Sequence, residues 1–363
     1  MANVLDLKRR IRSVKNTRQI TKAMKTVSAA KLRRAQERAM QARPYAQMLA
    51  NVLQSLVRRA DLYGDEGGDA MHPLLVEREE KNVLVLVIAG DKGFAGAFNS
   101  NIGKAAQKFI DSRRAGEQNI DIETVGRKAR DLFRRRYSEA SWKHSDVEYD
   151  NGLSHHIEDV RERKQPVELT HDLSQLLAKL TFADVDRAAH SIIERYERSE
   201  IDAVYVVYNE FKSVIAQRVV VEKLLPIRKL GSQEITAAEE MTEEQKEAAA
   251  HAAKSAGISV NEPEESVMDA EAKKFGTADV DYIYDEPPAK LFRSLLPRYV
   301  TTQIYHALLE SVASEHASRM TAMDAASSNA SEMIDKLTLT MNRARQAAIT
   351  TEIIEIVSGA AAL

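Results

Sequence analysis

A glycine-rich stretch is the part of this sequence that most suggests a binding site for a small molecule. Residues 90–97 read GDKGFAGA and directly follow an apolar run. A glycine turn between a strand and a helix can hold phosphate through backbone N–H groups. These glycines are spaced G-x-x-G-x-x-G, however, whereas dinucleotide sites have G-x-G-x-x-G and ATPase phosphate loops continue into G-K-S or G-K-T. The spacing favours a tight strand-to-helix turn over a nucleotide site.

The other reactive side chains form no recognisable active-site pattern. His155 and His156 are adjacent, so a helix would point them apart, and His306 and His316 lack the spacing of metal ligands on a helix. No G-x-S-x-G element supports a serine nucleophile. The chain has no cysteine, which excludes disulfides, thiolate metal ligands and cysteine nucleophiles. The sequence therefore predicts no catalytic residue, no cofactor and no metal site.

Long stretches without glycine or proline predict a long helix at each end of the chain. No proline precedes Pro44, no glycine precedes Gly64, and residues 298–358 contain neither. As a helix, residues 298–358 would span about 90 Å, too far to pack on one compact domain. Apolar residues recur three and four apart, as in a coiled-coil seam, although periodicity alone leaves an ordinary helical bundle open. The residues in question are Leu7, Ile11 and Val14, then Ile20, Met24 and Val27 after a shift, and Leu291, Leu295, Val300, Ile304 and Leu308 in the second helix.

The middle of the chain predicts an α/β domain. Strands are expected at 83–88, 121–125, 201–208 and 214–221, and helices from residue 102 and over 127–137 and 166–198. Because strands alternate with helices, we expect a Rossmann-like sheet with some parallel pairs. The expected organisation is a coiled-coil helix over 1–60, a central α/β domain over 75–226, an acidic insertion or linker over 227–286, and a second coiled-coil helix over 287–363.

An acidic segment precedes the last helix. Between residues 231 and 286 acidic side chains far outnumber the lysines, and there is no arginine. Thr242–Ala256 predicts a solvated helix, and the remainder a loop or disordered chain. The segment is either a tolerated loop or a regulatory surface element, and both readings stay open.

The first helix is strongly basic, in a chain whose net charge is only −2. A charge run is often just a solvated face, but uncompensated cations also predict an acidic partner, which could be nucleic acid, anionic lipid or protein. The near-neutral total argues against a protein devoted to nucleic acid. The cations are Lys8, Arg9, Arg10, Arg12, Lys15, Arg18, Lys22, Lys25, Lys31, Arg33, Arg34 and Arg38.

The C-terminal end is unusually apolar, through Ile353, Ile354, Ile356, Val357 and Leu363. Chain ends are commonly polar and frayed, so an apolar end predicts insertion into a dry protein sleeve. It is too short to cross a bilayer, as is every other apolar run in the chain. Residues 1–12 lack the apolar stretch of a secretory signal, and we expect a bacterial protein without a transit peptide.

Several motifs resemble those of the gamma subunit of F-type ATP synthases. They are RSVKNTRQITKAM at 12–24, RPY at 43–45, DKGFAGAFN at 91–99, ARQAAITTE at 344–352 and EIVSGA at 355–360. The resemblance covers nearly the whole chain outside the acidic segment. It implies an antiparallel coiled coil inside a ring of three alpha and three beta subunits, with the α/β domain against the epsilon subunit and the c-ring.

The resemblance also implies a function and a set of contact residues. The chain would be the non-catalytic rotor shaft that couples proton flow through the c-ring to the conformational cycle of the catalytic beta subunits. It would lie at the cytoplasmic face of the bacterial plasma membrane without spanning it. Contacts with the beta subunits fall on Met24, Lys25, Arg345, Gln346, Thr350 and Glu352, and the apolar end would run in a bearing.

Two departures from the family pattern stand out. Phe94 and Ala97 replace smaller residues of the glycine turn, and the acidic segment is longer than the usual connection. Without cysteine, thiol control of the kind seen in chloroplast relatives is excluded. On the residues alone, an enzyme built on the α/β unit and a coiled-coil adaptor for nucleic acid or anionic membrane remain alternatives, although neither accounts for both terminal motifs.

Overall fold

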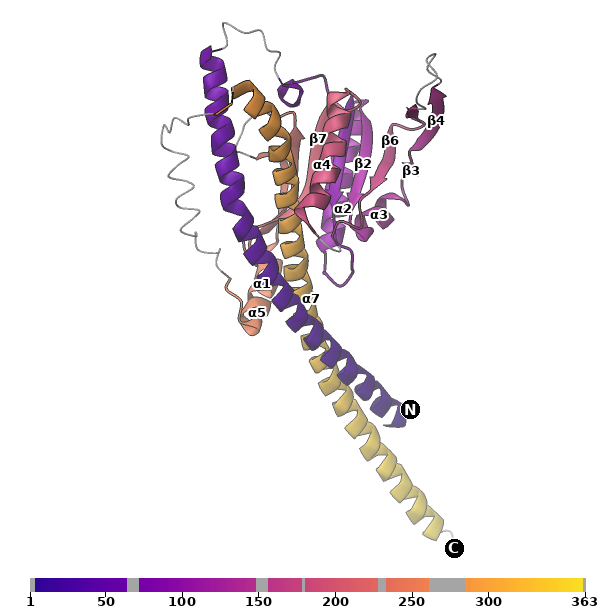
Figure 1. Ribbon diagram of the computed structural model, residues 1–363. Helices are drawn as coiled ribbons and strands as arrows, with labels where there is room; N and C mark the ends of the chain where they lie inside the picture. The colour runs from indigo at the N-terminus through magenta and orange to yellow at the C-terminus, as the bar shows by residue number, and fades with distance from the viewer. Residues whose placement is uncertain are drawn as a thin grey trace.

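Two long antiparallel helices and a sheet domain on their flank make up the molecule. The computed structural model describes residues 4–63, 72–147, 156–177, 180–227, 233–260, 285–286 and 288–361. Helix α1 (Val4–Tyr63) and helix α7 (Pro288–Ala361) run side by side in opposite directions, with both termini at one end of the molecule (Figure 1). The two helices expected at the ends of the chain are confirmed.

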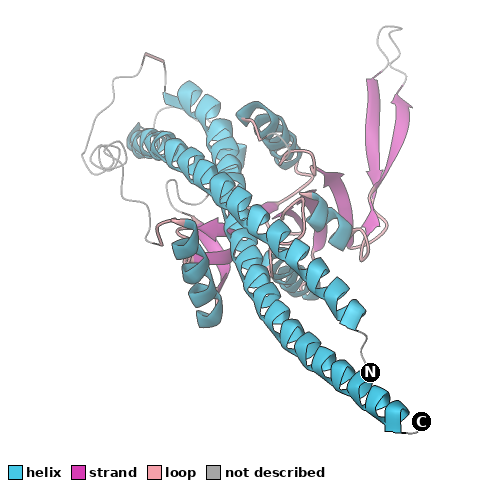
Figure 2. Cartoon of the chain, turned by 90° about the horizontal axis from the view of Figure 1, so that it is seen from below, coloured by secondary structure: helices cyan, strands magenta, loops and turns pink. Residues whose placement is uncertain are grey.

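The domain is built on a seven-stranded sheet of order β3-β6-β2-β1-β7-β8-β9. Neighbouring strands are parallel from β3 through β6, β2 and β1 to β7. Strands β8 and β9 continue the sheet with antiparallel pairing. A separate hairpin, β4 with β5, stands away from the sheet (Figure 2). The strand bounds are β1 Asn82–Ile88, β2 Asn119–Val125, β3 Ser138–Glu139, β4 Ser141–Val147, β5 His156–Glu162, β6 Val167–Asp172, β7 Ala203–Phe211, β8 Gln217–Leu225 and β9 Glu234–Glu240.

Helices cover both faces of this sheet, so its central strands are apolar on both sides. Helices α2 (Phe98–Ala115) and α3 (Arg127–Phe133) pack on the face that carries Val83, Val85 and Val87. Helix α4 (Phe182–Glu197) packs on the other face together with the second half of α1 and the first half of α7. A short 3-10 turn, Pro73–Leu75, contributes Leu74 to the same core. The coiled coil is therefore rooted in the domain by one continuous apolar core.

Two segments differ from the sequence-based expectation. The helix expected over 166–198 is wrong for its first part, where Val167–Asp172 forms β6 beside β2 and the helix starts only at Phe182. Residues 234–240, expected as loop, form β9 on β8. In both cases pairing with a distant strand decides the conformation, which local propensity does not register.

A further helix, α5 (Glu243–Ala256), confirms the helix expected over 242–256 but not its solvation. Ala249, Ala252 and Ala253 are buried against α1 and α7. Its start is fixed by a capping box between Thr242 and Gln245.

The seam of the coiled coil runs differently from the expected one. Leu7 and Ile11 are buried as expected, but Ile20 is 60% exposed and Val27 55% exposed. The seam keeps its three-and-four spacing without the predicted shift and passes through polar residues, namely Arg18, Thr21, Lys25 and Ser28, before it returns to Leu32, Ala35 and Ala39. Apolar periodicity misplaced the seam because its middle is not apolar.

Candidate functional site

The polar part of the seam is held by side chains of α7. Thr21 and Ser327 share a hydrogen bond of 2.7 Å between their hydroxyl oxygens, and the Arg18 guanidinium donates to the hydroxyl of Ser331. Short polar side chains allow the helices to approach closely, and each pair links positions about 300 residues apart in sequence. These pairs fix the register of α1 against α7.

Lys25, one of the contact residues predicted from the sequence, lies in this seam rather than on the outer surface. Its ammonium nitrogen is 2.6 Å from Asp324 Oδ1 and 2.5 Å from Ser255 Oγ of α5. The side chain is only 14% exposed. The ammonium group is therefore committed to contacts within the chain.

The residues displaced from the seam form an outer stripe, which we define as Ile20, Met24 and Val27. They are spaced four and three residues apart on α1, and Ile20 and Val27 are exposed while Met24 is half-buried. Exposed lysines, Lys22 and Lys31, accompany the stripe. An apolar stripe among cations is a surface suited to a partner that offers apolar and acidic groups.

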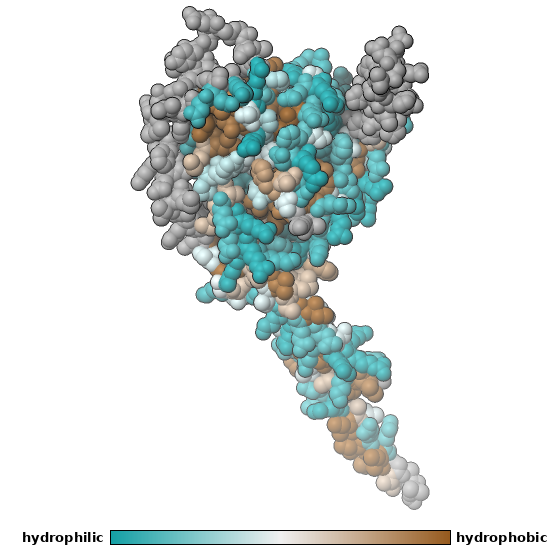
Figure 3. Space-filling view, in the orientation of Figure 1, coloured by the Kyte–Doolittle hydropathy of each residue, from teal (hydrophilic) through white to brown (hydrophobic). Residues whose placement is uncertain are grey.

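The last turns of α7 project beyond the beginning of α1 (Figure 1). The predicted contact residues in this part, Arg345, Gln346, Thr350 and Glu352, are all exposed, and the Thr350 hydroxyl donates to the carbonyl of Gln346. This free end is apolar as well, as the hydropathy-coloured surface shows (Figure 3). Its exposed side chains are Ile349, Ile353, Ile354, Ile356 and Val357, whereas Leu363 lies outside the described residues.

The glycine turn is packed against α7 and does not form a phosphate cradle. A Cβ on Gly90 would lie 2.8 Å from the Glu315 carboxylate, which therefore occupies the space above the turn. The carbonyl oxygens of Lys92 and Gly93 accept from the Arg319 guanidinium, at 3.4–3.5 Å. Phosphate needs N–H donors and no nearby anion. The turn connects β1 to α2 and packs against α7.

The junction between the glycine turn and α7 contains one ion pair and a neutral histidine. Arg319 is bonded to Glu315 one turn before it, and both side chains are nearly buried. Burial, with the nearby cations Arg319 and Lys31, lowers the pKa of His316 to about 4. The imidazole is therefore neutral at physiological pH, and its Nδ1 lies 3.3 Å from the Arg319 guanidinium.

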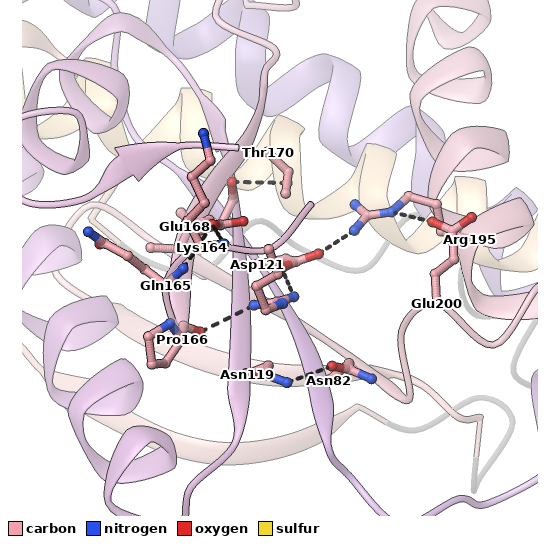
Figure 4. A network of polar contacts seen from close by, with 12 residues as sticks. Asn82, Asn119, Asp121, Lys164, Gln165, Pro166, Glu168, Thr170, Arg195 and Glu200 are labelled. Atoms are coloured by element: carbon pink, nitrogen blue, oxygen red, sulfur yellow. Dashed lines mark hydrogen bonds and ion pairs between the residues drawn. The ribbon is translucent and has the colours of Figure 1, made fainter. Parts of the chain in front are cut away.

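A buried ion network links strand β2 to helix α4 and to Arg163, which precedes β6 (Figure 4). Arg195 pairs with Asp121 and with Glu123, whose carboxylate is 2.8 Å from the Arg195 guanidinium. The Glu200 carboxylate lies 3.5 Å from the same guanidinium. Arg163 is 2.5 Å from the other oxygen of Asp121. Sequence reasoning missed this network because its members are far apart in the chain and belong to no motif. Its position inside the domain makes it a structural element.

The described residues contain no cluster of metal ligands and no helix that could span a membrane. Within them, no group of three or more histidine and carboxylate side chains is arranged to hold a metal ion. Among the same residues, no helix has an apolar stretch long enough to cross a bilayer.

Comparison with known proteins points to one family. A family model described as ATP synthase matches residues 3–363. The ATP synthase gamma chain of Solibacter usitatus is 45% identical over 362 residues, which covers 100% of this chain and 99% of that protein. The ATP synthase gamma chain of Geobacter sp. (strain M21) is 39% identical over 360 residues, covering 99% and 98%.

A solved structure supports the fold. A chain in the mitochondrial ATP synthase of Euglena gracilis, from an assembly of OSCP, F1 and c-ring in rotational state 3, aligns with a TM-score of 0.50 and 16% identity, covering 99% of this chain and 94% of that one. The combination of an α/β domain with a helical stalk is thus shared with that structure. By its full-length similarity, this chain belongs to the ATP synthase gamma-chain family.

Proposed function

We propose that this chain is the central rotor shaft of an F-type ATP synthase, which couples proton flow through the c-ring to the conformational cycle of the catalytic beta subunits during ATP synthesis. The observation that carries the proposal is the free end of α7. In a chain of the gamma-chain family, this single helix leaves the coiled coil and keeps Ile353, Ile354, Ile356 and Val357 exposed. Exposing the apolar side chains of a projecting helix to water costs free energy. A protein sleeve around the helix would remove that cost.

The partners follow from this position. One copy would stand within three alpha and three beta subunits, which would form the sleeve. The α/β domain would face the epsilon subunit and the c-ring. The outer stripe and the cations of α1 would meet apolar and acidic loops of the beta subunits. Arg345, Gln346, Thr350 and Glu352 are exposed on α7 and would make polar contacts with the same subunits.

The chain would take no part in the chemistry of ATP. Its glycine turn, the best candidate for a nucleotide site, is closed by Glu315 and bound through carbonyl oxygens to Arg319. The protein would be a peripheral component at the cytoplasmic face of the bacterial plasma membrane, held there by the complex. The position of Glu315 at the turn supports this non-catalytic role over the enzyme alternative.

Replacing Arg345 with alanine is expected to lower ATP-driven proton pumping by roughly tenfold, because one charge-assisted hydrogen bond to a partner contributes about 1.5–3 kcal/mol. The side chain is exposed, so folding should be unaffected. Pumping by membrane vesicles containing the assembled complex provides the measurement. Arg343→Ala is the matched control, since Arg343 is also exposed on α7 but faces nearly the opposite side of the helix. Equal pumping by both variants would remove Arg345 from the contact.

The composition of the assembly tests the proposal as a whole. Native mass spectrometry of the tagged chain, purified gently from its own cells, should show one copy with three alpha and three beta subunits. A monomer or homodimer without any larger assembly would contradict the rotor function. That result would favour a coiled-coil adaptor, which should bind DNA or anionic vesicles with a steep dependence on salt concentration.

A further inference from the structure

Helix α5 lies beside the coiled coil, close to the α/β domain (Figures 1 and 2), and packs on residues of both α1 and α7. Its buried face is made of alanines, which permit close contact. They share one apolar cluster with residues of α1, of α7 and of the turn between β7 and β8. The members of this cluster are Ala249, Ala252, Ala253 and Ile258 from the α5 region, Ala29, Leu32 and Ala35 from α1, Ala313, Ala317 and Met320 from α7, Phe211 at the end of β7 and Val214 in the turn after it.

The C-terminal end of α5 is bound by cations of α1. Arg33 donates to the carbonyl of Gly257 at 2.9 Å and to that of Ala256 at 3.4 Å. The Lys25 ammonium donates to the hydroxyl of Ser255. Carbonyls at a helix C-terminus lack intrahelical donors and carry partial negative charge, so cations placed there are stabilising.

A third contact ties α5 to α7. Asp324 accepts from Lys25 with one carboxylate oxygen and lies 2.9 Å from His251 Nδ1 of α5 with the other. The Asp324 side chain is only 15% exposed. Burial alone would raise its pKa, but the hydrogen bonds from Lys25 and His251 lower it. One carboxylate therefore joins α1, α5 and α7 at a single point.

Helix α5 has a defined cap at each end. The capping box starts it at Thr242, and Gly257 ends it in the left-handed conformation, at φ 65°. Just before it, β9 is paired with β8 in the sheet. Through β9 the helix is attached to the domain, and through its buried face and its C-terminal end it is attached to the coiled coil.

We infer from these contacts that α5 is a permanent clamp, which holds α1 and α7 in one register near the domain and remains docked while the coiled coil transmits force. The mechanical consequence rests on the proposed rotor function. The clamp also assigns Lys25 a role inside the shaft, in which it joins α1 to α5 and α7. At this level of α1, contact with a partner is left to the outer stripe.

Hydrogen exchange of the full chain on its own tests the clamp without reference to the rotor. In Ala252→Asp, a charge replaces a fully buried contact. We expect exchange of the amides of residues 25–39 in α1 to become at least about tenfold faster, because the local opening free energy falls by more than about 1.4 kcal/mol. Ala248→Asp is the control, because Ala248 is exposed on the same helix. Equal exchange in both variants would overturn the clamp.

A cross-link in the assembled complex distinguishes a permanent clamp from a movable latch. The chain has no cysteine of its own, so Ala29→Cys on α1 and Ala256→Cys on α5 supply its only two thiols. Both positions belong to the same apolar cluster, a short bismaleimide can join them, and Lys25, Arg33 and Asp324 stay in place. The double variant is compared with itself before and after linking. We expect ATP hydrolysis and proton pumping to be unchanged by the link. A severalfold loss on linking would show that α5 must leave the coiled coil during turnover, and the inference would fail.

The two experiments also separate this inference from the proposed function. If the chain forms no complex with alpha and beta subunits, the rotor function fails, while hydrogen exchange still decides whether α5 clamps the two helices. If the complex forms but the exchange of α1 is insensitive to Ala252→Asp, the clamp fails and the rotor function stands.

Discussion

Replacing Arg195 with methionine is expected to lower the free energy of unfolding of the α/β domain by about 3–5 kcal/mol. Arg195 is 8% exposed and pairs with Asp121 and Glu123, whose side chains are 1% and 3% exposed. Methionine fills similar volume without charge, so two buried carboxylates lose their shared partner. Arg163 remains on Asp121 and His171 on Glu123, which keeps the loss within this range.

Urea denaturation of the full chain, followed by circular dichroism, measures the effect. Arg198→Met is the matched control, since Arg198 lies just past the end of the same helix and pairs with Glu194 at 3.8 Å with both side chains largely exposed. Such a surface pair contributes about 0–1 kcal/mol. Adding Asp121→Asn and Glu123→Gln to Arg195→Met should restore part of the stability, because the buried charges are then removed together. If Arg195→Met unfolds no more easily than Arg198→Met, the network does not stabilise the domain.

Glu222→Gln is expected to stabilise the protein by up to about 3 kcal/mol above pH 8, and to have little effect near pH 4. Burial raises the pKa of the Glu222 carboxyl from 4.5 to about 7; the hydrogen bond from Tyr208 opposes the rise and nearby Glu210 adds to it. Between these two values the unfolded chain releases the proton while the folded chain keeps it. The free energy of unfolding of the wild type therefore falls as pH rises through this window, by about 1.4 kcal/mol for each pH unit.

The glutamine variant lacks this titration, and its amide oxygen can accept the same hydrogen bond from Tyr208. Thermal or urea unfolding at pH 5, 7 and 8.5 gives the difference between variant and wild type, which should grow with pH and level off above pH 8. Glu247→Gln, at an exposed position on α5, reports the effect of losing one charge from a solvated site. A difference between the Glu222 variant and wild type that does not change with pH would show that the Glu222 carboxyl ionises normally.

Polar residues occupy the middle of the seam between α1 and α7. Ile20, Met24 and Val27 have the spacing of a seam and were expected to form it, yet Ile20 and Val27 lie outside. Coiled coils use polar residues at seam positions to fix register, at a cost in stability. The pairing of Thr21 with Ser327 and of Lys25 with Asp324 has this character. Ile20 and Val27 are thereby left exposed on the outer side of α1.

Local features of the sequence were enough for much of the fold. The two terminal helices could be predicted because glycine and proline, which interrupt helices, are missing over long stretches. The β-branched runs of β1, β7 and β8 and the tight turn after β1 are also local signals, and the apolar end of α7 is visible in its composition. These features depend on residues that are neighbours in the chain, and such short-range preferences can be read without knowing the partners.

Tertiary structure alone decided the course of the seam, the strands β6 and β9, the docking of α5, and the buried network around Arg195. Each depends on a partner far away in sequence: Lys25 meets Asp324, β9 pairs with β8 after the end of the predicted domain, and Arg195 reaches back to β2. A polar residue can be solvated or buried with equal local propensity. Only the presence of a matching group across the interface makes burial favourable, and that group is brought there by the folded chain.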